Sequence, residues 1–170
     1  MYIDEEKMIS KINLSLFKKR KTRAQVWIET VVYTLIGISI IGILIAVSTP
    51  KINSYRDKLL IGQTIESLNN IESKVQEVRV AAGNRRVIDL KITKGNLVID
   101  GINNKVLWKL NSNYQYSEED AEINVGNLKL KTKKGNPWEI EIWRDYKNIL
   151  NITYSKKDEL KQFDTAPSPY

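Results

Sequence analysis

The 170-residue sequence contains no cysteine and no histidine. Without these side chains the chain cannot form a Cys/His zinc site, a Ser-His-Asp triad or a thiol nucleophile. It also cannot form disulfide bonds that would stabilise a small domain, so its apolar core must provide the stability. No pair of acidic residues stands in a motif typical of a catalytic cleft. The sequence therefore predicts a protein that is not an enzyme and that uses no cofactor and no metal ion.

Positive charge is concentrated at the start of the chain. The formal net charge is +7, and residues 1–24 alone, with seven basic and three acidic side chains, carry +4 of it. A nucleic-acid-binding protein spreads its positive charge over a folded surface. Here the charge instead precedes a hydrophobic run, which is the pattern of a membrane topology signal, and nucleic acid is not an expected partner.

A long hydrophobic run follows this basic leader. Residues 26–48, from Val26 to Ser48, are almost wholly apolar, and Glu29 is the one charged residue among them. As a helix the run would extend for about 35 Å, enough to cross a hydrocarbon core of about 30 Å. The basic residues Lys18 to Arg23 place the N-terminus in the cytoplasm by the positive-inside rule. The sequence predicts a single-pass protein of the cell membrane whose C-terminal part is extracytoplasmic.

A cleaved secretory signal peptide is the competing interpretation of the same run. It requires small residues at a cleavage site after the apolar stretch, and Ala46-Val47-Ser48 fits this loosely. The run is longer than the usual hydrophobic region of a signal peptide, which favours its retention as a membrane helix.

The residues after the run predict a second, amphipathic helical part. Pro50 is expected to kink or break the helix, and Gly83 to end it. Between them one apolar stripe recurs at spacings of three and four, which predicts a helix packed on a sheet; a coiled-coil contact between chains is the alternative. The stripe comprises Ile61, Ile65, Leu68, Ile71, Val75 and Val78, and the polar residues Gln63, Glu66, Asn69, Glu72 and Lys74 are expected off it.

After Gly83 the apolar period changes to two, which predicts β-strands. The expected strands lie at residues 88–92, 97–100, 106–110, 128–132, 138–142 and 150–154, with a polar loop over 111–121. The hairpin over 128–142 has a five-residue loop. Pairing of Leu130 with Ile140 would place Lys131 opposite Glu139 and Lys129 opposite Glu141, two favourable cross-strand charge pairs.

The predicted fold is α+β: a long N-terminal transmembrane helix continues into an amphipathic helix that packs on a small antiparallel β-sheet. Five segments are expected: the basic cytoplasmic leader 1–24, the transmembrane helix 25–49, the amphipathic helix 50–83, the β-rich extracytoplasmic domain 84–154, and the polar, Pro-containing tail 155–170, which is expected to be a linker.

The junction between leader and apolar run carries the functional signal. Its sequence is Lys21-Thr22-Arg23-Ala24-Gln25-Val26-Trp27-Ile28-Glu29. It resembles the class III signal peptide of type IV pilins, in particular the archaeal form. The resemblance implies that a membrane prepilin peptidase cuts between Ala24 and Gln25, so that Glu29 becomes the fifth residue of the mature chain. Two residues differ from the usual pattern: Ala24 stands in place of Gly, and Trp27 in place of Ser.

The resemblance implies a structural subunit of a type IV pilus-like filament, with other pilin-like subunits, the peptidase and membrane lipid as partners. Cleavage would expose a positive α-amino group at Gln25, four residues from the Glu29 carboxylate. Neither charge tolerates burial alone, so their pairing within a helix or between subunits would fix how apolar helices stagger. The alternative is a monomeric, membrane-tethered binding domain that is not cleaved at this position.

Three weaker signals lie in the predicted outer domain. Asn151-Ile152-Thr153 is a glycosylation sequon, with Asn151 as the acceptor. Lys133-Lys134 forms a basic loop tip, either a solvated hairpin end or an adhesive patch. The acidic loop Glu118-Glu119-Asp120 lacks the spaced ligands of a calcium loop, although it could still hold a cation.

Overall fold

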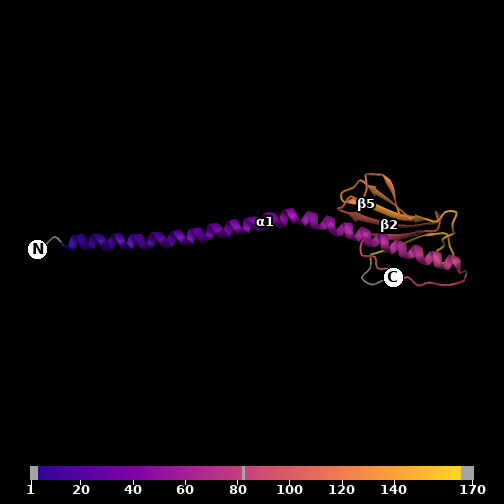
Figure 1. The fold of residues 1–170 in the computed structure, drawn as a ribbon, viewed down its shortest axis with the longest axis horizontal. Helices are drawn as coiled ribbons and strands as arrows, with labels where there is room; N and C mark the ends of the chain where they lie inside the picture. The colour runs from indigo at the N-terminus through magenta and orange to yellow at the C-terminus, as the bar shows by residue number, and fades with distance from the viewer. Residues whose placement is uncertain (1–3, 82, 166–170) are drawn as a thin grey trace. The chain divides into compact units, whose positions relative to one another are not determined.

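The structure is a computed structural model that describes the backbone of residues 4–81 and 83–165, and side chains from residue 25 onward within these ranges. One long helix, α1, runs from Asp4 to Val80 (Figure 1). Pro50 lies inside α1, so the helix does not break there, and the alternative of a kink at Pro50 stays a prediction. The chain divides into two units, residues 1–49 and 50–170, each described by itself.

The second unit contains one antiparallel sheet that α1 covers with its later part (Figure 1). The sheet order is β3-β4-β5-β2-β1-β6, and every neighbouring pair is antiparallel. The strands are β1 (Asn96–Asp100), β2 (Lys105–Ser112), β3 (Glu122–Val125), β4 (Leu128–Lys133), β5 (Trp138–Asp145) and β6 (Leu160–Asp164). The described fold is α+β, with a long apolar N-terminal helix and a six-stranded sheet, as the sequence predicts.

Alternation along the central strands explains why they form a two-faced sheet. In β2, Val106, Trp108 and Leu110 are buried, and the residues between them are partly exposed. In β4 and β5 the same period of two buries Leu130 and Ile142, among others. Side chains at successive strand positions point to opposite faces, so these apolar sets lie on the face toward α1. The predicted strands 97–100, 106–110, 128–132 and 138–142 are confirmed as parts of β1, β2, β4 and β5.

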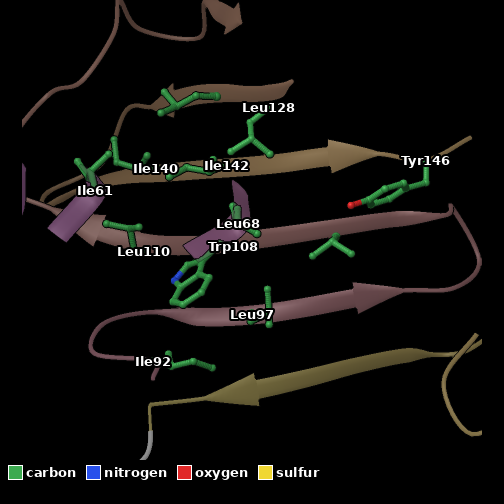
Figure 2. Packing of buried hydrophobic residues seen from close by; sticks show 12 residues of the cluster. Ile61, Leu68, Ile92, Leu97, Trp108, Leu110, Leu128, Ile140, Ile142 and Tyr146 are labelled. Carbon is green, nitrogen blue, oxygen red and sulfur yellow. The ribbon is translucent and has the colours of Figure 1, made fainter. Parts of the chain in front are cut away.

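The core lies between α1 and this sheet face. Ile61 and Leu68 of α1 are fully buried in a cluster with strand residues, and Figure 2 shows both among the labelled side chains of the strands. Ile65, Ile71 and Val75 are partly buried against the same cluster. The predicted packing of the helix stripe on the sheet is confirmed from Ile61 to Val75. Gly83, with a φ of 85°, adopts the left-handed conformation that glycine favours after a helix end.

Two predicted strands are wrong. Residues 84–93 and 150–153 form no strand, although Ile92 is buried and Leu150 and Ile152 pack against the core. Their apolar side chains alternate because every second residue packs against the edge of the core, although the backbone does not pair with a strand. The backbone N–H of Ile152, for example, donates to Oδ1 of Asn104 at 2.7 Å.

Two real strands were not predicted. β6 lies within the expected linker 155–170 and pairs with β1 along its whole length, so the linker prediction is wrong for residues 160–164. Its two apolar residues, Leu160 and Phe163, fall on opposite faces, so no alternation marks the strand. β3 has only four residues, with Ile123 and Val125 half-buried. Residues 166–170 lie outside the described part.

The register of the β4–β5 hairpin differs from the prediction by two residues. Leu130 pairs with Ile142, and Lys131 lies opposite Glu141 rather than Glu139. The pairing of Lys129 with Glu141 is therefore also wrong, because Lys129 lies opposite Trp143. A slip of one residue turns every side chain to the other face, but a slip of two keeps each face. The apolar pattern alone therefore could not separate these two registers.

Candidate functional site

The apolar part of α1, residues 25–49, exposes its hydrophobic side chains on all sides. An 18-residue window within the helix is long and apolar enough to cross a membrane, and none of it is buried within the described protein. Ile38 and Ile43, for instance, are 62% and 64% exposed. Exposed apolar surface of this extent on a soluble protein marks a site of contact with lipid or protein. This helix is therefore compatible with membrane anchoring and with helix–helix packing.

The hydroxyl groups of this segment bond within the helix itself. Thr30 donates to the carbonyl of Val26 at 2.9 Å, and Ser39 donates to the carbonyl of Leu35 at 2.7 Å. Thr34 and Thr49 make the same bond to the residue four positions earlier. A hydroxyl that bonds back to its own helix leaves no unsatisfied donor in an apolar environment.

Glu29 is the one charged side chain among residues 26–48, and it has a specific partner. The side-chain amide of Gln25 donates to its carboxylate at 3.2 Å, one helical turn away. The residue expected to become the N-terminus therefore lies on the same helix face as Glu29. Ala24 lies within α1, but its side chain is outside the described part, so the structure leaves the processing site untested.

The other predicted sites all lie in the second unit. Asn151 is exposed, as expected for a sugar acceptor, but it lies in an irregular segment rather than a strand. In the acidic loop, Asp120 pairs with Lys131 at 3.1 Å. At the basic tip, Lys133 pairs with Glu141 at 2.9 Å. Glu119 and Lys134 approach to 3.6 Å. Among the described residues no cluster of acidic side chains could hold a metal ion.

A buried carboxylate that the sequence did not point to joins α1 to the sheet at Asp57. Its side chain is 4% exposed and accepts hydrogen bonds from the backbone and side-chain nitrogens of Asn113 at 2.7 and 2.8 Å. Lys94 also forms an ion pair with it. Burial alone would raise the pKa of Asp57, but the bonds from Asn113 and Lys94 outweigh this, so its pKa is lowered.

A second buried carboxylate, Glu72, lies about four turns further along α1. It accepts hydrogen bonds from the Tyr146 hydroxyl and from the Gln76 amide at 2.8 Å, and the Arg144 guanidinium lies at 3.4 Å. Burial would raise the pKa of Glu72, but these three partners together lower it. Burial and the adjacent carboxylate raise the pKa of Tyr146. The expectation that Glu72 lies off the buried stripe is therefore wrong.

Both carboxylates occupy the helix face that packs on the sheet. Asp57, Ile61, Leu68 and Glu72 follow one another at spacings of four or seven, which places them on one side of a helix. A search for apolar residues alone could not find these two carboxylates. They are acidic residues at positions where the helical period predicts a buried side chain. With their partners in the strands and in the adjoining loops they form two polar anchors, the Asp57 anchor and the Glu72 anchor, that fix α1 against the domain.

Comparison with known proteins identifies no relative. No protein-family model matches the chain, and neither a curated protein nor a solved structure matches it.

Proposed function

We propose that the chain is a membrane-anchored structural subunit of a type IV pilus-like surface filament. Its N-terminus is cytoplasmic, residues 26–48 cross the membrane, and the domain with the six-stranded sheet is extracytoplasmic. A prepilin peptidase cuts between Ala24 and Gln25, and the mature chain assembles with other pilin-like subunits. The observation that carries this proposal is an apolar helix exposed on all sides whose only charge, Glu29, follows Gln25 by one turn.

In this function the exposed apolar helix lies first in the membrane and later in the filament. In the membrane, lipid covers its side chains, and its backbone and hydroxyl groups are satisfied internally. In a filament, the same side chains pack against those of neighbouring helices. Lipid and protein are equally apolar partners, so the helix can exchange one for the other without exposing its surface to water.

The polar pair supplies the specificity that an apolar surface lacks. After cleavage the α-ammonium of Gln25 and the carboxylate of Glu29 lie within one turn of each other, as the present contact of 3.2 Å between their side chains indicates. A charge buried among packed helices is costly unless an opposite charge accompanies it. Pairing within or between subunits therefore favours one axial stagger over others, much as one buried polar residue selects the register of a coiled coil.

The substitution Glu29→Gln tests this role because it keeps the shape and removes the charge. We expect a normal or slightly higher membrane level, since an insertion penalty is removed. We expect at least a tenfold lower recovery of the protein in filaments sheared from the cell surface. The matched control is Tyr33→Phe, which removes a polar group from an exposed residue of the same helix and should assemble normally.

Two results would count against the proposal. Filaments at the normal yield in Glu29→Gln would remove the role of the carboxylate. If the unaltered protein is neither cut at Gln25 nor found in filaments, a monomeric membrane-tethered binding domain describes the chain better.

A further inference from the structure

A hollow of about 440 Å³ lies on the surface of the second unit, beside the first turns of α1 after residue 49. We call it the basic hollow. It is lined by Pro50, Lys51, Ser54, Tyr55, Lys58 and Tyr114. The four middle residues stand at spacings of three and four, so they share one face of the helix. Two ammonium groups and hydroxyl groups therefore line one hollow, and no acidic side chain is among its lining residues.

One wall of the hollow is held in place by the core. Tyr114 packs against the buried cluster and meets Tyr116 edge-to-face, with ring centroids 6.3 Å apart. The ammonium of Lys58 lies 5.4 Å from the centre of the Tyr114 ring, within the range of a cation–π contact. This contact restrains the long Lys58 side chain, so less conformational freedom is lost when a ligand binds.

The Asp57 anchor both positions this wall and keeps the hollow positive. It bonds Asn113, the residue before Tyr114, and so ties the loop to the helix beside Lys58. Asp57 is the only acidic residue in the range 50–60, and its charge is directed inward against Lys94. The charges of Lys51 and Lys58 are therefore not cancelled by their nearest acidic neighbour in sequence.

The hollow is also close to the membrane segment along the chain. Residues 51–58 are helical and follow Ser48 within ten positions of the sequence. Helical side chains lean toward the N-terminus, and long lysine side chains extend toward the interface. Given that residues 26–48 cross the bilayer, which is the function proposed above, Lys51 and Lys58 belong to the first residues of the chain on the outer side of the membrane.

We infer that the basic hollow binds the phosphate of an anionic lipid head group in the outer leaflet. Lys51 and Lys58 pair with the phosphate charge, and the hydroxyls of Ser54 and Tyr55 donate hydrogen bonds to its oxygens. The bound lipid holds the outer domain at the membrane surface before assembly. A phosphate ion in solution offers the same chemistry, but the short stretch of sequence between the apolar run and the lining residues Lys51 to Lys58 favours the lipid.

The test measures how fast a water-soluble acylating reagent modifies Lys58 in the full-length chain, read by peptide mass spectrometry. The chain is placed in nanodiscs of phosphatidylcholine alone, or of phosphatidylcholine with one third phosphatidylglycerol. We expect Lys58 to react about tenfold more slowly with the anionic lipid present. Lys147 and Lys156, which are exposed and lie outside the hollow, should react equally in both discs.

Two variants separate a site from general surface charge. Lys51→Gln removes one partner of the phosphate and should raise the Lys58 rate about fivefold in the anionic discs. Arg56→Gln removes the same charge from an exposed neighbour that does not line the hollow, and should change the rate less than twofold. Equal effects of the two substitutions would overturn the inference.

Other results would also overturn it. Equal Lys58 rates in the two kinds of disc would exclude lipid selectivity, and slowing by added inorganic phosphate in phosphatidylcholine discs would indicate a free-phosphate site. Protection that depends on the number of chains per disc would assign the hollow to a second copy. Release of the chain from membranes by alkaline carbonate would refute both the membrane function and the hollow, whereas a retained chain with equal rates refutes the hollow alone.

Discussion

Residues 25–49 and 50–80 of α1 are both helical, but the surroundings of their apolar side chains differ. In the first part Ile38 and Ile43 are more than half exposed, and the hydroxyl groups bond back to their own helix. In the second part Ile61 and Leu68 are buried on a sheet, and the acidic residues on that face have fixed partners. The first part therefore leaves its apolar surface uncovered by the described chain, and the second part buries its apolar surface within the domain.

This comparison predicts which substitutions destabilise the outer domain. The largest effect is expected for Trp108→Ala, because the ring is 2% exposed in the core and its Nε1 donates to the Lys94 carbonyl at 3.1 Å. The free energy of unfolding should fall by about 3–5 kcal/mol. Denaturant titration of the full chain in mild detergent, followed by near-ultraviolet circular dichroism, measures this change.

The control for that prediction lies in the first part of α1. Trp27→Ala removes a ring that is 71% exposed, so the unfolding free energy of the outer domain should stay the same within about 0.5 kcal/mol. Similar losses for both tryptophans would mean that the two parts of α1 do not differ as described.

The two acidic residues Glu72 and Glu29 allow the same comparison for charge. Glu72→Gln weakens the bonds to Tyr146 and Arg144 inside the domain, so we expect a loss of about 2–3 kcal/mol in unfolding free energy. Glu29→Gln should leave that free energy unchanged and affect only assembly. An unchanged unfolding free energy in Glu72→Gln would show that the Glu72 anchor adds nothing to stability.

The pH dependence of stability should be a smaller effect and should arise in part from the second part of α1. The pKa values of Asp57 and Glu72 are lowered in the folded chain, so both carboxylates stabilise it above their unfolded pKa values of 3.8 and 4.5. This contribution is lost as the pH falls through the lowered pKa values. Urea titrations between pH 7 and pH 2.5 should show a decline that is shallower in Asp57→Asn, and an unchanged slope would contradict this origin.

Sequence patterns predicted the parts of this fold that have long, regular periods. The stripe from Ile61 to Val75 predicted the packed helix, and the alternation around Trp108 predicted a central strand. The apolar residues at 88–92 led to a wrong strand prediction, because residues at the edge of a core can alternate between buried and exposed without pairing with a strand. β6 was missed because its residues present no apolar face, and it forms through backbone bonds to β1.

The two anchors show a different limit. Asp57 and Glu72 are polar, so a search for apolar side chains passes over them, and their partners outside α1 lie 37 to 74 residues away in sequence. Only the packing of α1 on the sheet brings Lys94, Asn113 and Tyr146 to them. Glu29 could be singled out from the sequence because it is the only charge in an apolar run.

The N-terminal residue of the membrane-extracted protein tests the central claim most directly. Chemical sequencing or intact mass determination of the chain from its native membrane should give a start at Gln25, with residues 1–24 removed and the apolar helix retained. A start at Met1 would contradict processing by a prepilin peptidase. A start after Ser48 would show a cleaved secretory signal instead, and the first part of α1 could then have no place in a filament.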